Sequence, residues 1–229
     1  MEPSNAETST SIGLFDVPSE RTRLIDTSNS IGFPFIASII LFFSDENLAS
    51  DSFEEMKVQT KKNTQKYKKN LYSQCIKANK ILGVKDIFFE NLDDNRFDNY
   101  NLLKIVKIIE KYLKKLKPFI VFTHSKNDLN IDHRITFEST LTACRPMQES
   151  SVKKLLCFEV ASSTEWSFGK ISESFKPNYF VDIEGNIKNK LKSLKFYKNE
   201  MRKYPHPRSL KNVENLSMIR GASVGLKNA

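Results

Sequence analysis

The chain has 229 residues, of which 39% are hydrophobic, and a formal net charge of +9. This length fits one large α/β domain, or at most two small ones. The sequence holds no run of about 18 or more apolar residues, which argues against a membrane span. Its N-terminus also lacks the basic and apolar regions of a signal peptide. We therefore expect a cytoplasmic protein with no membrane partner.

The cysteines and the positive charge exclude two further classes of protein. Cys75, Cys144 and Cys157 are widely spaced and form no Cys-x-x-Cys pair, so neither a disulfide framework nor a thiolate zinc site is indicated. Lysines alternate with Asn and Glu along the expected helices. A nucleic-acid footprint would instead cluster basic residues among stacking aromatic side chains. We expect no nucleic-acid partner.

Expected strands and helices alternate along the chain. Residues 1–30 are rich in Ser, Thr, Asn, Asp and Glu, which predicts a poorly ordered or degenerate N-terminal segment. The strands are expected at residues 35–43, 84–90, 119–123, 155–160 and 178–183. The helices are expected at residues 52–82, 102–116, 135–144 and 187–201, with Gly83 ending the first. This order predicts an α/β, Rossmann-like three-layer fold with a mostly parallel sheet.

The segment 119–134, FIVFTHSKNDLNIDHR, is the most informative stretch of the sequence. An apolar run ends at His124, and the polar loop after it carries Asp128, Asn130, Asp132 and His133. Open α/β sheets place their chemistry at the carboxyl ends of strands. An imidazole and a carboxylate on such a loop can share a divalent metal, and zinc accepts this set of ligands. An Asp-His pair is also common as a surface hydrogen-bonding unit, so the residues alone leave both interpretations open.

Several short blocks, in order, are similar to those of one enzyme family. Residues 127–137, NDLNIDHRITF, resemble the loop that carries the third metal ligand in the PIG-L/LmbE-type zinc-dependent N-deacetylases. The other blocks are Ser44-Asp45, Leu82-Gly83-Val84, Asp94-Asn95-Arg96, Phe158-Glu159 with residues 162–166, and Arg220-Gly221-Ala222. The resemblance covers residues 31–229, which we interpret as a PIG-L/LmbE-like deacetylase domain.

The resemblance implies roles for three residues of the loop. His133 would be a zinc ligand, and Asp132 would orient its imidazole. Asn130 stands where the family often has a further His, and it could donate a hydrogen bond to an oxyanion. The implied activity is zinc-dependent hydrolysis of an N-acetyl group on an amino sugar or sugar conjugate, which would be the partner of the chain.

Five further residues are candidates for substrate binding by the same resemblance. Trp166 would be a platform for a sugar ring, although a half-buried core Trp is the alternative. Arg96 and Glu165 would bind a hydroxylated substrate or form ordinary ion pairs. His206 would line the pocket, with Arg202 and Arg208 beside it, or lie on a surface loop.

The family's N-terminal His-Pro-Asp-Asp motif, which supplies two ligands and the general base, is missing. The corresponding residues 12–20 keep Pro18 but have Val17, Ser19 and Glu20 around it, and no His precedes His124. Three explanations stay open: a catalytically inactive relative, an altered N-terminal segment, or a rearranged site that uses His124, Asp128 and His133. The alternative function is therefore a module that binds a sugar-like ligand or a partner.

Overall fold

A computed structural model describes residues 23–24, 43–44, 54–148, 150–168 and 174–229 of the chain. The expected poorly ordered segment 1–30 lies outside these residues except for Arg23 and Leu24. The region 12–20 aligned with the missing motif and nearly all of the strand expected at 35–43 also lie outside them. Within the described part, no helix is both long and apolar enough to cross a membrane.

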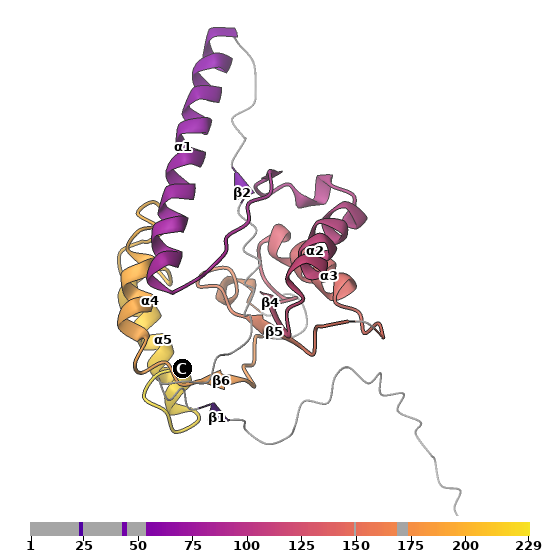
Figure 1. Cartoon of the computed structure of the whole chain (residues 1–229). Helices are drawn as coiled ribbons and strands as arrows, with labels where there is room; N and C mark the ends of the chain where they lie inside the picture. The colour runs from indigo at the N-terminus through magenta and orange to yellow at the C-terminus, as the bar shows by residue number, and fades with distance from the viewer. Residues whose placement is uncertain (1–22, 25–42, 45–53, 149, 169–173) are drawn as a thin grey trace, which may run out of the picture.

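Helices lie on two sides of a central pair of parallel strands (Figure 1). Strands β4 (Ile120–His124) and β5 (Lys154–Phe158) pair in parallel, with His124 opposite Phe158. Helices α2 (Leu102–Leu116) and α3 (Ile131–Ala143) pack together on one side, and on the other α4 (Ile187–Leu194) contacts both α1 (Glu54–Ile81) and α5 (Leu210–Ala222). Two short parallel pairs join β1 (Arg23–Leu24) to β6 (Phe180–Val181) and β2 (Phe43–Ser44) to β3 (Leu92–Asp93). The expected α/β fold with a parallel sheet is confirmed.

The core beside the central strands is built around the apolar face of α2. Ile105 and Ile109, one helical turn apart, are buried together with Leu92 and Phe97. Phe97 is fully buried and opens the short 3-10 helix η1 (Phe97–Asn99). Asn101 caps α2 by accepting a hydrogen bond from the backbone of Leu103. This core fixes the loop before α2 against α3, where the site lies.

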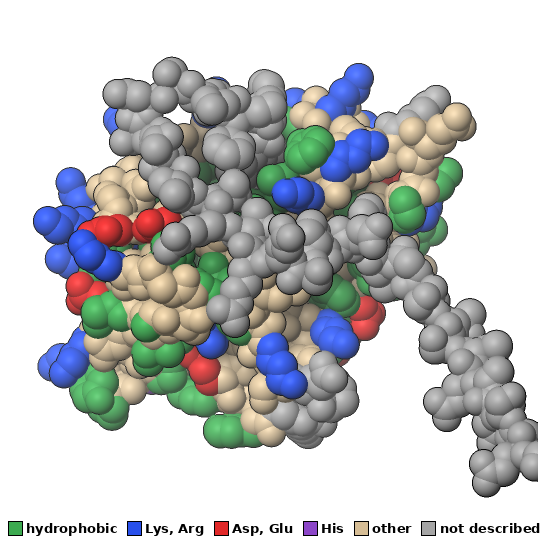
Figure 2. All heavy atoms as spheres, turned by 90° about the horizontal axis from the view of Figure 1, so that it is seen from below, with side chains coloured by type: hydrophobic (Ala, Val, Ile, Leu, Met, Phe, Trp, Pro, Cys, Tyr) green, Lys and Arg blue, Asp and Glu red, His purple; other side chains and the backbone are tan. Residues whose placement is uncertain are grey.

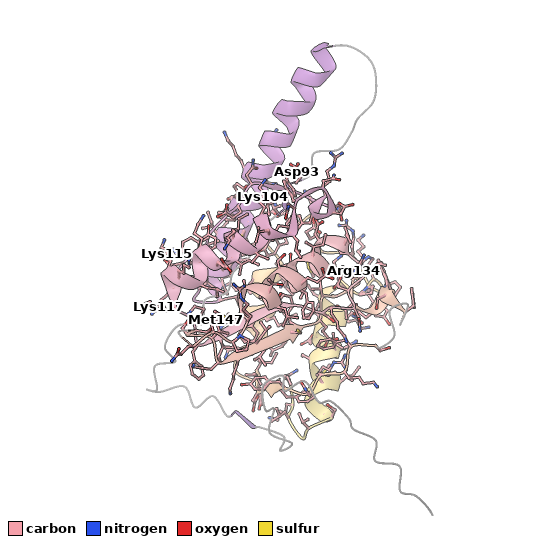
Figure 3. All side chains as sticks on the ribbon, turned by 90° about the vertical axis from the view of Figure 1, so that its right-hand side faces the viewer. Asp93, Lys104, Lys115, Lys117, Arg134 and Met147 are labelled. Atoms are coloured by element: carbon pink, nitrogen blue, oxygen red, sulfur yellow. The ribbon has the colours of Figure 1, made fainter. Side chains whose placement is uncertain are left out.

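The lysines of α2 lie on its exposed face. Lys104 and Lys115 stand at the periphery of the molecule, and each ammonium lies over an aromatic ring, that of Tyr100 at 4.3 Å and that of Phe88 at 4.6 Å (Figure 3). Figure 2 shows basic side chains scattered among acidic and apolar ones over the face in view. The absence of a nucleic-acid partner stays a prediction, and it agrees with this solvated, mixed surface.

The expected strand at residues 84–90 is wrong, because this segment forms no regular element and β3 follows it. The physical reason lies in its aromatic side chains. Phe89 packs on Tyr72 of α1 and Phe88 packs on Tyr112 of α2, with ring centroids 4.4 and 4.8 Å apart. The apolar residues that suggested a strand therefore hold a connection between two helices.

Helix boundaries were less predictable than helix positions. The helices expected at 52–82 and 102–116 and the strands expected at 119–123 and 155–160 are confirmed within two residues. Gly83 ends α1 with φ of 72°, as its conformational freedom allows. The third helix begins at Ile131 rather than 135 because Asn130 caps it, and the fourth ends at Leu194 rather than 201. Helix α5, which was not anticipated, begins behind the capping side chain of Ser209.

Candidate functional site

His133 is held in the first turn of α3, just beyond the carboxyl end of β4. Asn130 begins the helix: its Oδ1 accepts hydrogen bonds from the backbone N–H groups of Asp132 at 2.8 Å and His133 at 3.4 Å. This cap fixes the backbone that carries the imidazole. It also uses the Asn130 carbonyl oxygen and leaves the amide Nδ2, which donates to Asn95 Oδ1 at 3.3 Å.

Asp128 is the carboxylate that contacts the His133 imidazole. Its Oδ1 lies 3.0 Å from His133 Nδ1 and accepts a hydrogen bond from the backbone of Asn130 at 2.9 Å. Its Oδ2 accepts a hydrogen bond from the Thr164 hydroxyl at 3.2 Å, and the side chain is fully buried. The two atoms are within ion-pair distance, but His133 Nδ1 forms no hydrogen bond with a described residue. The orienting contact expected of Asp132 is therefore made by Asp128.

Asp132 faces the other way, toward the loop before α2. Its carboxylate accepts hydrogen bonds from the backbone N–H groups of Asn95 at 2.5 Å and Phe97 at 2.9 Å. Burial raises the pKa of Asp132, and the two N–H donors oppose that rise. The residue ties α3 to η1, which is a structural contact rather than a contact with a reacting group.

His124 is brought onto His133, but in a geometry unsuited to sharing a metal. The two rings are stacked, with centroids 4.1 Å apart and planes 17° apart. An imidazole lone pair lies in the plane of its ring, so two stacked rings do not direct their lone pairs to one point. Desolvation, together with the charge of His133, lowers the pKa of His124 to about 3, so the ring is neutral. The rearranged site with His124, Asp128 and His133 does not fit this arrangement.

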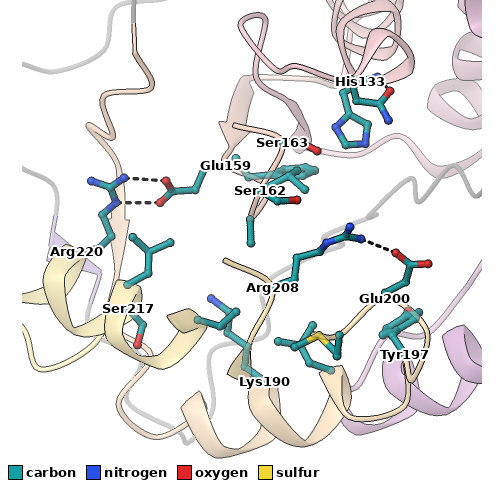
Figure 4. A pocket seen from close by; sticks show the side chains of 18 of the residues that line it. His133, Glu159, Ser162, Ser163, Lys190, Tyr197, Glu200, Arg208, Ser217 and Arg220 are labelled. Carbon is teal, nitrogen blue, oxygen red and sulfur yellow. Dashed lines mark hydrogen bonds and ion pairs between the residues drawn. The ribbon is translucent and has the colours of Figure 1, made fainter. Parts of the chain in front are cut away.

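A cavity of about 700 Å³ opens beside His133 (Figure 4). One wall comes from the loops that follow β3, β4 and β5 and from the first turn of α3, and it includes Asp94, Asn130 and His133. The facing wall comes from α4, α5 and the loop between them. The cavity therefore lies at the carboxyl ends of the parallel strands, where the fold class places ligands.

Two ion pairs connect residues that line the cavity. Arg220 of α5 binds Glu159, which follows β5, through two parallel hydrogen bonds of 2.9 and 2.7 Å. That bidentate contact raises the pKa of Arg220. Arg208 donates from Nη1 to Glu200 at 2.6 Å. Of these four residues, Arg208 was expected on the pocket wall by the resemblance, and Glu159 and Arg220 lie in blocks that resemble the family. Glu200 was not anticipated.

The five predicted substrate residues lie outside the cavity lining. Glu165 accepts a hydrogen bond from the backbone of Ser162 at 2.6 Å, within its own turn. The Trp166 ring meets the His206 ring edge to face at 5.1 Å. Arg202 donates to the carbonyl oxygen of Asn199. Arg96 also does not line the cavity, and no structural observation supports substrate binding by any of these residues.

A metal site is not complete in the described part of the chain. Within residues 54–148, 150–168 and 174–229, together with the two short strands β1 and β2, no group of three or more His, Cys, Asp or Glu side chains is placed to hold a metal ion. Catalytic zinc sites use three protein ligands. The described residues offer His133 and do not by themselves fit a zinc ion.

Fold and site together define a Rossmann-like α/β protein with a ligand cavity at the carboxyl ends of its strands. Residues 39–144 match the model of the PIG-L family, GlcNAc-PI de-N-acetylase, and the resemblance found in the sequence is thereby confirmed over this segment. The matched residues include α2, β4 and α3, and therefore the wall that carries His133.

Solved structures share the fold at low sequence identity. The conserved protein TT1542 from Thermus thermophilus is 14% identical, with a TM-score of 0.57 over 82% of this chain and 76% of that chain. GalB, the 4-carboxy-2-hydroxymuconate hydratase from Pseudomonas putida KT2440, is 18% identical, with a TM-score of 0.50 over 70% of this chain and 64% of that chain. The N,N'-diacetylchitobiose deacetylase from Pyrococcus horikoshii is 16% identical, with a TM-score of 0.49 over 72% of this chain and 62% of that chain.

The similarities to TT1542 and to the hydratase establish the fold and not the reaction. This chain spans less than two thirds of the hydratase and of the deacetylase. A hydratase on the same fold shows that the architecture supports different chemistry. A search of curated proteins gives no significant match.

Proposed function

We propose that the chain is a deacetylase-type hydrolase of the PIG-L kind, with an N-acetylated amino sugar or sugar conjugate as its substrate. The observation that carries the proposal is the placement of His133, held by Asp128 on the cavity wall within the segment that matches the family. The domain responsible would comprise residues 31–229. A cytoplasmic location stays a prediction.

Each residue of this wall has a task that its contacts support. The carboxylate of Asp128 lies 3.0 Å from His133 Nδ1, beside the ring that lines the cavity. Asn130 lines the same cavity with an amide Nδ2 that can donate a hydrogen bond to a carbonyl oxygen of the ligand. The loop between β4 and α3 would therefore bind the acetamide group.

Deacetylases of this family are generally metal-dependent, and zinc is the cofactor we propose. His133 would supply one ligand, and the other ligands would have to come from residues outside the described part. We therefore assign the hydrolytic step to no described residue. The proposal for this part of the chain is ligand binding and the orientation of His133.

A second function is favoured by the incomplete metal site. A catalytically inactive relative would bind the same N-acetylated ligand, or a partner, without hydrolysing it. The absence of a three-ligand group among the described residues is the observation behind this alternative. The two functions share the cavity and differ in whether zinc is held.

Acetate release and zinc content of the purified chain, measured together, test both functions. For the hydrolase we expect about one zinc per chain and acetate release from N-acetylglucosamine conjugates, both lost in His133→Ala. Glu138→Ala is the matched control, because Glu138 is an exposed side chain on the same helix and away from the cavity. A folded chain without zinc and without acetate release, but still binding the sugar, would establish the inactive module. Zinc retained by His133→Ala would overturn the role of His133.

A further inference from the structure

Tyr197 is the aromatic side chain on the cavity wall that faces His133. Among the described residues, two aromatic side chains line the cavity, Phe158 and Tyr197. Phe158 follows β4's partner on the wall with His133 and packs on His124, with ring centroids 4.9 Å apart. In Figure 4, Tyr197 lies across the cavity from His133. Tyr197 is therefore placed to meet the part of a ligand that lies opposite the His133 wall.

The hydroxyl group of Tyr197 is held by a buried pair of residues on α1. It is hydrogen-bonded to the sulfur of Cys75, which is fully buried. Asn79, one turn further along α1, is also buried and donates from Nδ2 to the same sulfur at 3.2 Å and to the Cys75 carbonyl oxygen at 3.0 Å. A buried polar network of this kind fixes the side chains that take part in it. Because the hydroxyl is bonded to a buried sulfur, the ring is the part of Tyr197 that borders the cavity.

The backbone of Tyr197 is fixed by the turns that follow α4. Its N–H donates to the carbonyl oxygen of Leu194 at 3.0 Å, and its own carbonyl oxygen accepts from the N–H groups of Glu200 and Met201, both at 3.0 Å. Leu194 and Met201 line the cavity together with the ring. A ring that is held at both ends loses little conformational freedom when a ligand packs on it, so more of the contact energy appears as affinity.

We propose that Tyr197 is the platform on which a pyranose ring of the ligand packs. The inference rests on the proposed function and deepens it, because the ligand must present a sugar ring to Tyr197 while its acetamide group reaches the wall with His133. A gluco-configured pyranose carries C–H groups on its faces and hydroxyl groups around its edge, so a face packs well on an aromatic ring. Trp166 was expected in this role, but its ring packs on His206 outside the cavity lining.

Proton NMR of the full chain during ligand titration tests the platform without any substitution. The ligand is the methyl glycoside of N-acetylglucosamine. We expect intermolecular NOEs between the Tyr197 ring protons and the C–H protons of the sugar ring. Those sugar protons should also shift upfield on binding, because they lie above the face of an aromatic ring.

Calorimetric titration of variants measures what the ring contributes. Tyr197→Leu should weaken binding of the glycoside about tenfold, since it removes an aromatic contact. Tyr197→Phe keeps the ring and should retain most of the affinity. Tyr204→Leu is the control, because Tyr204 lies in the same connection between α4 and α5, is 58% exposed and does not line the cavity. The control should bind like the unchanged chain.

The outcomes separate this inference from the proposed function. A bound glycoside without NOEs to Tyr197, or an unchanged affinity in folded Tyr197→Leu, would overturn the platform and leave the sugar-binding function standing. If the N-acetylated glycoside does not bind, the methyl glycoside of glucose, which has no acetamide group, is titrated in its place. Binding of this sugar with NOEs to Tyr197 would uphold the platform while the proposed function fails, and no binding of either sugar would overturn both.

Discussion

The two walls of the cavity are built in different ways. The wall with His133 is a buried structure in which a carboxylate, a helix cap and a hydroxyl lie within one compact set of hydrogen bonds. The facing wall is joined to the rest of the cavity by a long-range ion pair, Arg220 with Glu159, whose side chains are 29% and 20% exposed. A buried polar network fixes geometry strongly, whereas a partly exposed ion pair contributes little free energy and can adjust to a ligand.

The largest effect should come from Asp128→Ala. The change removes a fully buried carboxylate and leaves the Thr164 hydroxyl and the Asn130 N–H without their acceptor. We expect a loss of about 3 kcal/mol in the free energy of unfolding, measured with urea. Asp98→Ala is the control, because Asp98 is exposed, and it should change stability by less than about 0.5 kcal/mol. Similar losses in the two variants would mean that Asp128 does not anchor this wall.

The neutral His124 should make the same wall sensitive to acid. In the unfolded chain this His gains a proton near pH 6.5, whereas in the folded protein its pKa is about 3. Its contribution to stability is therefore present above pH 6.5 and is lost as the pH falls toward 3. Between pH 7.5 and pH 5 the metal-free chain should lose about 2 kcal/mol more than His124→Gln does. If the free energy of unfolding of the two proteins fell equally between pH 7.5 and pH 5, the burial of a neutral His124 ring would be contradicted.

A substitution of Asp132, on the same wall, should cause a smaller loss of stability. Asp132→Asn replaces one acceptor oxygen by an amide that cannot accept the N–H of Asn95 or Phe97. We expect a loss of about 1–2 kcal/mol in urea unfolding. Ligand affinity should change little, because the side chain faces η1 and does not line the cavity. A large loss of ligand affinity without a loss of stability would instead support the role first expected of Asp132, which was to orient the His133 imidazole.

The smallest effect should appear on the facing wall. A double-mutant cycle with Arg220→Gln and Glu159→Gln should give a coupling of about 1 kcal/mol or less, because both groups keep some contact with water. Thermal or urea unfolding of the four proteins measures this coupling. A value of about 3 kcal/mol or more would show that the two walls are equally rigid.

The difference between the two walls also explains which features of the site could be predicted from the sequence. The strand that ends at His124 and the loop after it follow from an apolar run and from polar residues close together in the chain, so β4 and the position of His133 were predictable. The role of Asp128 was assigned to Asp132, because adjacency in sequence does not say which side of a helix start a carboxylate faces. The contact between Glu159 and Arg220 spans 61 positions, so no local sequence pattern predicts it.

Two other sequence-based expectations differ from the structure because of side-chain packing. The segment 84–90 looked like a strand because its phenylalanines are apolar, yet those rings pack on Tyr72 and Tyr112. Trp166 and His206 looked like pocket residues, and they pack on each other outside the cavity lining. Composition tells which side chains are suited to burial or binding, but tertiary packing decides which partner each one meets.

The most direct measurement uses the three histidines as reporters during ligand titration. The chain contains only His124, His133 and His206, so three imidazole signals can be followed by NMR. On addition of the methyl glycoside of N-acetylglucosamine, we predict a saturable shift of the His133 signal and little change at His206, which lies outside the cavity lining. A ligand that saturates the protein without moving the His133 signal would contradict the proposed site.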